Sequence, residues 1–283
     1  MIERLAIVGV GLLGGSLAKA ARTQAIAREI VGIGRDEGRL RPALTDGTLD
    51  RITTDLADGL RGADRVVLGA TVLANETLLP QIWRAAAPGA IVTDVGSTKR
   101  GIVTVAERLA PSRRDVQFVG SHPMAGSEKA GYAVARADLF QGATVVMTPT
   151  ESNSPAAVKS VGELWTAVGA RVVTLEADAH DRAVAAISHL PHMVAWALVD
   201  AVARFEPEAF AVAARGFKDT TRIAAADPDV WREILLANRD AVVASVAAFR
   251  AALDDLERLV ARGDGVALTA LLARVKAARE KVS

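Results

Sequence analysis

The chain has 283 residues, of which 51% are hydrophobic and 24% charged, as in a globular protein with one large domain or two ordinary ones. Its 34 Lys and Arg nearly balance its 33 Asp and Glu, so no basic excess points to nucleic acid or to an anionic membrane surface. It has no cysteine, which excludes disulfides, thiolate metal ligands and a cysteine nucleophile. No signal-peptide pattern opens the chain, and no uninterrupted apolar run is long enough to span a bilayer, so we expect a cytoplasmic protein.

Residues 1–177 alternate between predicted strands and helices. Apolar runs predict strands at residues 5–8, 30–33, 65–70, 90–94, 116–119, 143–147 and 171–175. Helical periodicity is expected at residues 17–27, 37–44, 99–109 and 155–168. This alternation predicts an α/β domain of the Rossmann type, a doubly wound and mostly parallel sheet with helices on both faces.

From residue 178 onward the pattern is alanine-rich and helical. Segments at residues 178–198, 207–214, 228–259 and 266–281 have a period of 3.6, and no strand pattern appears. We therefore predict a dinucleotide-binding domain at residues 1–177 and an all-helical domain at residues 178–283. Pro191 is expected to kink the first helix, and the long helix from Pro228 is apolar on more than one face, as in a bundle or a subunit interface.

A glycine turn lies between the first predicted strand and helix. Gly9, Gly11 and Gly14 have the spacing that lets a backbone turn tightly, approach a pyrophosphate and pack a helix on a strand. With Leu12 and Leu13 they form the predicted cofactor site, and the alternative is an ordinary glycine turn.

The end of the second strand indicates which cofactor binds. An acidic residue there would hydrogen-bond the ribose of NAD, but this chain has Gly34 followed by Arg35, which can pair with the 2′-phosphate of NADP. Asp36 lies next to them and keeps NAD open as the alternative. Thr71, which follows the strand at residues 65–70, completes the predicted cofactor site.

His122 is the first candidate for acid–base chemistry. It precedes Pro123 directly after the predicted strand at residues 116–119, so its backbone is expected to be extended and its imidazole to lie at the strand end, where open α/β sheets bind ligands. Ser97 follows the strand at residues 90–94 and is expected within reach of that imidazole. A simple helix cap is the alternative for Ser97.

The helical region contributes further polar candidates. Ser188 and His192 are four residues apart and share one helix face. The pair His189 and His192, together with His180, suggests zinc, but with no cysteine, no His-Glu-x-x-His motif and no acid cluster we expect no metal. Arg222 belongs either to a binding site or to a solvated charge cluster, and the residues alone do not separate the two.

Together these motifs resemble the prephenate and arogenate (cyclohexadienyl) dehydrogenase family. The resemblance rests on the turn at residues 9–14, Asp94-Val95-Gly96-Ser97, His122-Pro123-Met124-Ala125-Gly126 with Glu128, Ser188-His189-Leu190-Pro191-His192, and Gly216-Phe217-Lys218-Asp219 with Arg222 and Trp231. It implies oxidative decarboxylation of prephenate to 4-hydroxyphenylpyruvate and CO2 in tyrosine biosynthesis, and a homodimer held by the helical domains.

The resemblance also implies roles for single residues. His122 would accept a hydrogen bond or proton from the ring hydroxyl, assisted by Ser97, and Arg222 would hold a substrate carboxylate. The other substrate-site residues would be Ser188 and His192 near the side chain, Trp231 closing the site, and Glu128 and Asp219 orienting these charges. We expect the site in a cleft between the two domains.

Three other functions remain open. Arogenate dehydrogenase, or an enzyme of dual specificity, is the nearest, although some arogenate enzymes have an apolar residue where this chain has His192. A β-hydroxyacid or imine reductase with the same two-domain plan is more distant. A nicotinamide-binding sensor without turnover is the alternative outside enzymes.

Overall fold

The computed structural model describes residues 1–127 and 129–281. By their contacts, residues fall into two compact units, Met1–Asn238 and Arg239–Ser283, which are described separately. The predicted domain boundary at residue 178 rests on the change to an alanine-rich, helical sequence pattern, and it stays a prediction.

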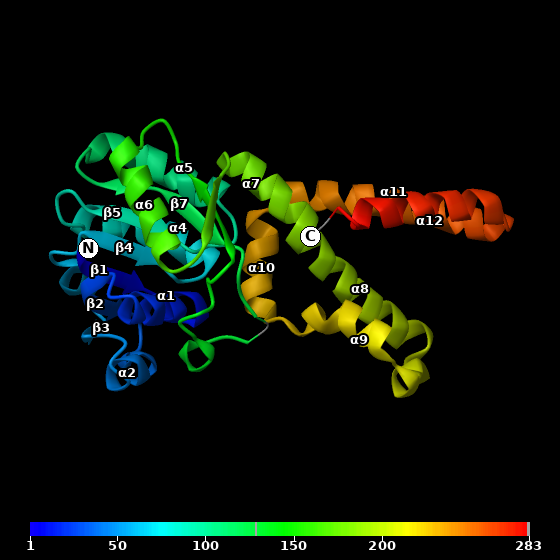
Figure 1. Ribbon diagram of the computed structural model, residues 1–283, viewed down its shortest axis with the longest axis horizontal. Coiled ribbons are helices and arrows are strands. Elements are labelled where there is room, and N and C mark those ends of the chain that lie inside the picture. Colours follow the sequence, from blue (N-terminus) through cyan, green and yellow to red (C-terminus); the bar gives the residue numbers. More distant parts are fainter. Residues whose placement is uncertain (128, 282–283) are drawn as a thin grey trace. The chain divides into compact units, whose positions relative to one another are not determined.

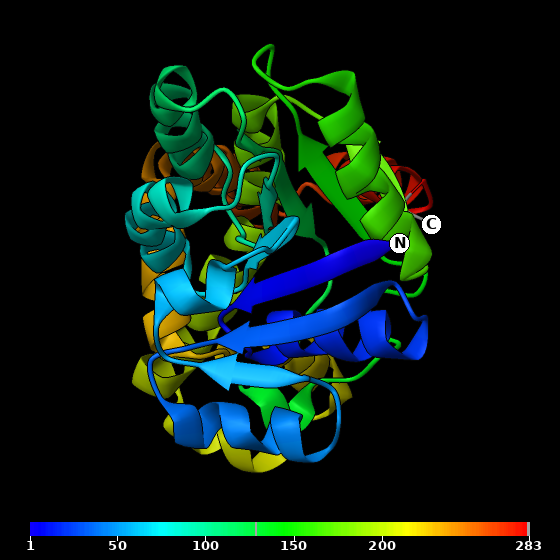
Figure 2. The same ribbon diagram turned by 90° about the vertical axis from the view of Figure 1, so that its left-hand side faces the viewer.

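A six-stranded parallel sheet forms the first part of the larger unit, and Figure 2 shows its first strands running the same way. Its strand order is β3-β2-β1-β4-β5-β6. The strands are β1 Ile2–Val8, β2 Ala27–Ile33, β3 Arg51–Thr53, β4 Arg65–Leu68, β5 Ile91–Asp94 and β6 Gln117–Phe118. Leu5 of β1 pairs with Ile30 on one side and Arg65 on the other. The order reverses beside β1, and such a point in an open sheet is where ligands bind.

Helices cover both faces of this sheet (Figure 1). They are α1 Leu12–Thr23, α2 Glu37–Thr45, α3 Leu56–Leu60, α4 Val72–Ala85, α5 Arg100–Leu109 and α6 Pro155–Ala167, with 3-10 turns at Ala110–Ser112 and Tyr132–Val134. One core contains Leu17 of α1 and Trp165 of α6, and the other contains Trp83 of α4 and Ile102 of α5. The predicted doubly wound fold is confirmed, although α1 begins and ends earlier than predicted and residue 27 starts β2.

The chain leaves the parallel sheet after β6 and builds a second sheet. β7 Gly120–Pro123 pairs antiparallel with β8 Thr144–Thr148, which pairs parallel with β9 Arg171–Thr174. The expectation that His122 lies in a loop at a strand end is wrong, since it lies within β7 opposite Val146. Gly120 permits this pairing, because a Cβ there would meet Thr148 Oγ1 at 2.4 Å.

The rest of the larger unit is helical. Its elements are α7 Ala177–Val184, a π-helical turn Ala185–His189, α8 Leu190–Phe205, a 3-10 helix Pro207–Val212, α9 Arg215–Thr221, a 3-10 turn Arg222–Ala225 and α10 Pro228–Ala237. A kink was expected at Pro191, because it has no N–H to donate to the carbonyl of Ile187. The helix instead widens into a π-helical turn just before Pro191.

The continuous stretch Ala177–Phe205 is, by length and mean hydropathy (1.2), apolar enough to cross a membrane. The expectation concerned an uninterrupted apolar run, and this helix is interrupted by His180, Asp181 and Arg182.

The smaller unit is a pair of helices, α11 Arg239–Arg262 and α12 Gly265–Arg279. Asp264 caps α12 by accepting a hydrogen bond from Ala267 N at 3.0 Å. The predicted single helix over residues 228–259 is wrong, because α10 ends at Ala237 and a new helix begins at Arg239.

Candidate active site

A buried ion pair fixes the loop after β5 against β7. Asp94 Oδ1 accepts from the backbone N–H of Ser121 at 3.0 Å, and its other oxygen accepts from Lys99 Nζ. Lys99 Nζ also donates to the carbonyl of Ser121 at 2.9 Å. Both charged side chains are fully buried. Ser97, which is half-buried on this loop, is thereby held near the strand that carries His122, although it makes no hydrogen bond to any described residue.

His122 is hydrogen-bonded to a second histidine. Its Nδ1 lies 2.8 Å from His180 Nε2, and His180 Nδ1 lies 2.7 Å from Asp181 Oδ1. Burial, followed by the neighbouring His180, Lys99 and His189, holds the pKa of His122 well below its usual value. His122 is therefore neutral near pH 7 and can accept a proton.

The second group of predicted residues gathers around Trp231 of α10. His192 stacks on the indole with ring centroids 3.6 Å apart, and its Nδ1 donates to the carbonyl of Ser188 at 2.9 Å. Burial lowers the pKa of His192, the Ser188 carbonyl opposes that shift, and the charge of Arg222 adds to it. Arg222 begins the 3-10 turn Arg222–Ala225, which is held to α8 by the hydrogen bond from Trp196 Nε1 to Ala224 O at 3.0 Å, and Trp196 lies edge-on to Trp231. The structure therefore brings Ser188, His192 and Trp231 together and places Arg222 on the turn that packs against their helix.

Two predicted residues are not placed in this group. Asp219 is exposed and lies 3.9 Å from Arg215. Glu128 lies outside the described residues.

Other polar residues of the site were missed by sequence reasoning. Asn238 Nδ2 donates to the carbonyl of Asp181 at 2.7 Å and lies 3.2 Å from His189 Nδ1. Burial lowers the pKa of His189 to about 4. His180 was considered only as a zinc ligand, and among the described residues no cluster of three His, Asp or Glu could hold a metal. The hydrogen bonds that join His180 to His122, and Asn238 to Asp181 and His189, connect residues that are distant in sequence, so no local pattern reveals them.

The glycine turn fits a dinucleotide phosphate. Gly9 has φ +97°, and a Cβ there would lie 2.6 Å from Ala70 N. A Cβ at Gly14 would lie 2.1 Å from Gly9 O, so α1 packs closely on the turn. Above Gly11, by contrast, nothing lies within 4 Å, and no side chain caps the first turn of α1, which Leu12 and Leu13 begin. Open space facing free amides at a helix start is an anion site.

The loop at residues 69–71 borders this cradle and meets α10. Asn75 holds the loop by accepting from Ala70 N at 3.1 Å and donating to Ala70 O at 3.2 Å. Thr71 is the exposed residue just before α4, and the next turn donates from Leu73 N to Glu233 of α10 at 3.2 Å. The cradle and the helix carrying Trp231 are therefore connected through α4.

The end of β2 places Gly34 and Arg35 where the cofactor ribose is expected. Arg35 is exposed and makes no hydrogen bond or ion pair with any described residue. Asp36 caps α2, accepting from Gly38 N at 2.8 Å. Its carboxylate therefore already has a structural role.

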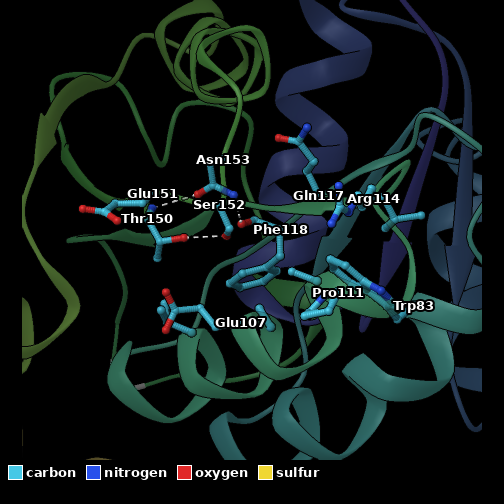
Figure 3. A pocket seen from close by; sticks show the side chains of 14 residues that line it. Trp83, Glu107, Pro111, Arg114, Gln117, Phe118, Thr150, Glu151, Ser152 and Asn153 are labelled. Atoms are coloured by element: carbon cyan, nitrogen blue, oxygen red, sulfur yellow. Dashed lines mark hydrogen bonds between the residues drawn. The ribbon is translucent and has the colours of Figure 1, made fainter.

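Two hollows lie in the larger unit. Figure 3 shows one of about 540 Å³ beyond the edge strand β6, lined by residues such as Trp83, Phe118 and Asn153 and by none of the predicted site residues. The second, of about 290 Å³, has His180 in its wall beside Val184 and Ile187. A doubly wound sheet with an open glycine turn, a buried neutral histidine and a cluster of aromatic side chains beside a cationic turn is the arrangement of a nicotinamide-dependent dehydrogenase.

Comparison with known proteins shows the family to which the chain belongs. Residues 17–174 match the prephenate dehydrogenase nucleotide-binding domain, and residues 176–274 match the prephenate dehydrogenase dimerization domain. The chain belongs to the prephenate dehydrogenase family and is an oxidoreductase.

Individual relatives agree. The chain is 35% identical to prephenate dehydrogenase of Bacillus subtilis over 86% of its own length and 66% of that protein. It superposes with a TM-score of 0.92 and 34% identity on prephenate dehydrogenase of A. aeolicus in complex with hydroxyphenyl propionate and NAD+, covering 100% and 99% of the two chains. Synechocystis arogenate dehydrogenase gives a TM-score of 0.85 at 30% identity, covering 99% and 100%.

Proposed function

We propose that this chain catalyses the NADP-dependent oxidative decarboxylation of prephenate to 4-hydroxyphenylpyruvate. The observation that carries the proposal is His122, a neutral buried imidazole whose Nε2 has no hydrogen-bond partner among the described residues. An unpaired acceptor of this kind suits the hydroxyl of a ring that is about to become aromatic.

Residues of this chain would bind the substrate, accept the hydroxyl proton and exclude water. The bound nicotinamide supplies the hydride acceptor for C4 of the ring while the ring carboxylate departs as CO2. His122 accepts the hydroxyl hydrogen at Nε2 as positive charge develops at C4. Arg222 holds a carboxylate through its planar fork, and Trp231 with His192 shields the ring from water. Ser97 orients the imidazole and the cofactor from its loop.

Arogenate is the second candidate substrate, and one observation favours it. Since Nδ1 of His192 donates to the Ser188 carbonyl, the neutral ring presents only an acceptor at Nε2. An acceptor suits the ammonium of arogenate better than the keto oxygen of prephenate, whereas the charge of Arg222 disfavours an ammonium. Prephenate remains the leading substrate because of that charge and the family.

An assay of prephenate and arogenate, each with NADP and NAD, tests the proposal. We expect reduced cofactor and 4-hydroxyphenylpyruvate from prephenate with NADP. H122N should lower kcat by about 10³-fold while the Kd of NADP changes by less than about twofold, because the imidazole of His122 takes part in the reaction and not in cofactor binding. No product from either substrate would refute the function, and full activity of H122N would refute the role of His122.

NADP preference rests on Gly34 and the unpaired Arg35. R35A should weaken NADP binding by about 10-fold or more and leave NAD unchanged, since a charge-assisted bond to phosphate is lost. R39A is the control, because Arg39 faces Asp36 at 3.8 Å. An unchanged ratio of Kd values in R35A would contradict the assignment.

We infer a homodimer through the helical region. Apolar side chains stand exposed there, with Ile187 68% and Phe205 89% accessible. A second copy would cover such a surface, and the match to a dimerization domain supports it. With that face covered, the stretch Ala177–Phe205 has no need of a lipid environment, in keeping with the cytoplasmic location expected from sequence.

A further inference from the structure

We propose that Asp181 and His180 form a relay that sets the tautomer of His122 and shares the positive charge that His122 acquires. The proposal rests on the proposed function for its kinetic consequence, but not for the tautomer. Both residues are positioning residues, because they act through His122.

The direction of the hydrogen bonds follows from Asp181. Its Oδ1 accepts from the backbone N–H of Lys99 at 2.7 Å, and its Oδ2 accepts from that of Arg100 at 3.0 Å. Burial raises the pKa of this carboxyl, but the hydrogen bonds from His180 and the two amides outweigh burial and lower it. Asp181 is therefore an ionised acceptor, and His180 Nδ1 must donate to it.

The same logic reaches His122. In the proposed relay His180 carries a single ring proton, on Nδ1, so its Nε2 has a lone pair, which faces His122 Nδ1 at 2.8 Å. His122 must donate there, so its own proton is on Nδ1. The lone pair is then left at Nε2, the atom that needs to accept the hydroxyl proton. Without these hydrogen bonds the proton of His122 could lie on either ring nitrogen, and Nε2 would not be fixed as the acceptor.

The relay also offers the charge a counterion. When a proton moves from the substrate hydroxyl to His122 Nε2, the Nδ1 proton can move to His180 Nε2, which places the positive charge beside Asp181. Two protons shift by one bond each and none is gained or lost. The reverse shift restores the neutral pair when the hydroxyl recovers its proton.

The surrounding charges make such a counterion necessary. His180, His189 and Lys99 all act against a charged His122, and burial acts in the same direction. Two other carboxyl groups face Lys99. Asp94 is paired with Lys99. Burial raises the pKa of Glu76, and the charges of Asp181 and Asp94 raise it further. Asp181 is thus the carboxylate connected to His122 by hydrogen bonds.

A purely structural role is the rival explanation, since His180 is fully buried. The tautomer separates the two without any turnover. Nitrogen-15 spectra of the imidazoles in the whole protein, with only four histidines to assign, should show His122 protonated at Nδ1 and unprotonated at Nε2. The opposite tautomer would overturn the proposal, and this result is independent of which substrate the enzyme takes.

Two variants of His180 separate orientation from charge sharing. The carbonyl oxygen of the side chain in H180Q can accept from His122 Nδ1 but cannot take its proton, so we expect kcat to fall about 10-fold. H180L removes the acceptor as well, and we expect a fall of about 10²-fold or more. In H180Q the acidic limb of the kcat profile should move to lower pH, because the charge on His122 can no longer move to the ring beside Asp181. Asp181→Asn should move the limb in the same direction.

Y132F is the control, since Tyr132 donates to Asp46 Oδ2 and accepts from Thr48 Oγ1 at a buried position away from the histidines. It should leave the acidic limb where it is. Equal losses in H180Q and H180L with an unmoved limb would overturn the relay. Should H180L not fold, the limb in H180Q and the nitrogen-15 spectra still decide. Failure of the wild-type protein to convert any substrate would instead refute the proposed function.

Discussion

Arg222 begins the turn Arg222–Ala225, which packs against α8, the helix that carries His192. If Arg222 holds a substrate carboxylate, that contact exists both before and during the reaction. R222A should therefore raise KM by roughly 50-fold, as expected for losing one charge-assisted pair, and change kcat by less than about fivefold.

Arg215 provides a matched control for this variant. It lies seven residues earlier with 96% of its side chain exposed and Asp219 as its ionic neighbour. R215A should leave both constants unchanged in the same steady-state assay. An unchanged KM in R222A would show that Arg222 does not bind substrate.

Lys99 supports the site through its ion pair. Burial lowers its pKa, and Asp94 partly restores it. K99M would leave the carboxylate of Asp94 buried without its cation, so we expect the free energy of unfolding to fall by about 3–5 kcal/mol. K159M breaks an exposed pair with Glu163 at 3.7 Å and should change it by less than about 0.5 kcal/mol. Urea denaturation measures both, and equal effects would contradict the difference in burial.

The residues predicted from sequence were those with a local signal. His122 precedes a proline after an apolar run, and Ser188 and His192 share a helical spacing. His180 and Asn238 have no such signal, because their partners are 58 and 57 residues away in sequence. Only the folded chain shows that they belong to the site.

At the scale of elements, the strand, turn and helix at residues 2–23 act as one unit whose glycines differ in role. G14A would place a Cβ 2.1 Å from a backbone oxygen, so we expect it to lower the free energy of unfolding by about 3 kcal/mol. G11A meets nothing within 4 Å and should cost about 1 kcal/mol at most. G11A should nevertheless weaken cofactor binding by more than about 10-fold, since its methyl group would occupy the phosphate space.

Fluorescence titration with NADP and NAD, together with thermal melts, tests this difference. Equal stability of the two variants would contradict the packing argument. Unchanged cofactor affinity in G11A would show that the phosphates lie elsewhere.

Element types were largely predictable, whereas strand partners were not. Alternation of apolar runs and helical periods predicted five of the six parallel strands of the first sheet, but not the short strand β3 or the helices α3 and α4. The same pattern at residues 143–147 and 171–175 does not reveal that these strands join β7 in a separate sheet of order β7-β8-β9. The break at Asn238 was missed because its flanking residues all favour helix, and the tertiary hydrogen bonds of Asn238 override that preference.

At the scale of the whole molecule, buried neutral histidines make stability depend on pH. His122, His189 and His192 all have pKa values lowered chiefly by burial, and that of His189 falls to about 4. In the unfolded chain each would titrate near 6.5. Below that pH the unfolded state therefore binds more protons than the folded state, and stability is lost as pH falls.

The free energy of unfolding should accordingly be constant above about pH 7 and decrease between about pH 6.5 and about pH 4. His189 alone contributes a loss on the order of 3 kcal/mol across this window. Glu76, whose pKa is raised, opposes the trend, because it takes up a proton more readily when folded. Urea denaturation at several pH values in this range measures the slope. H189Q, which removes one buried titrating group, should flatten it, and a slope that is the same in H189Q and in the wild-type protein would show that His189 does not stay neutral in the folded chain.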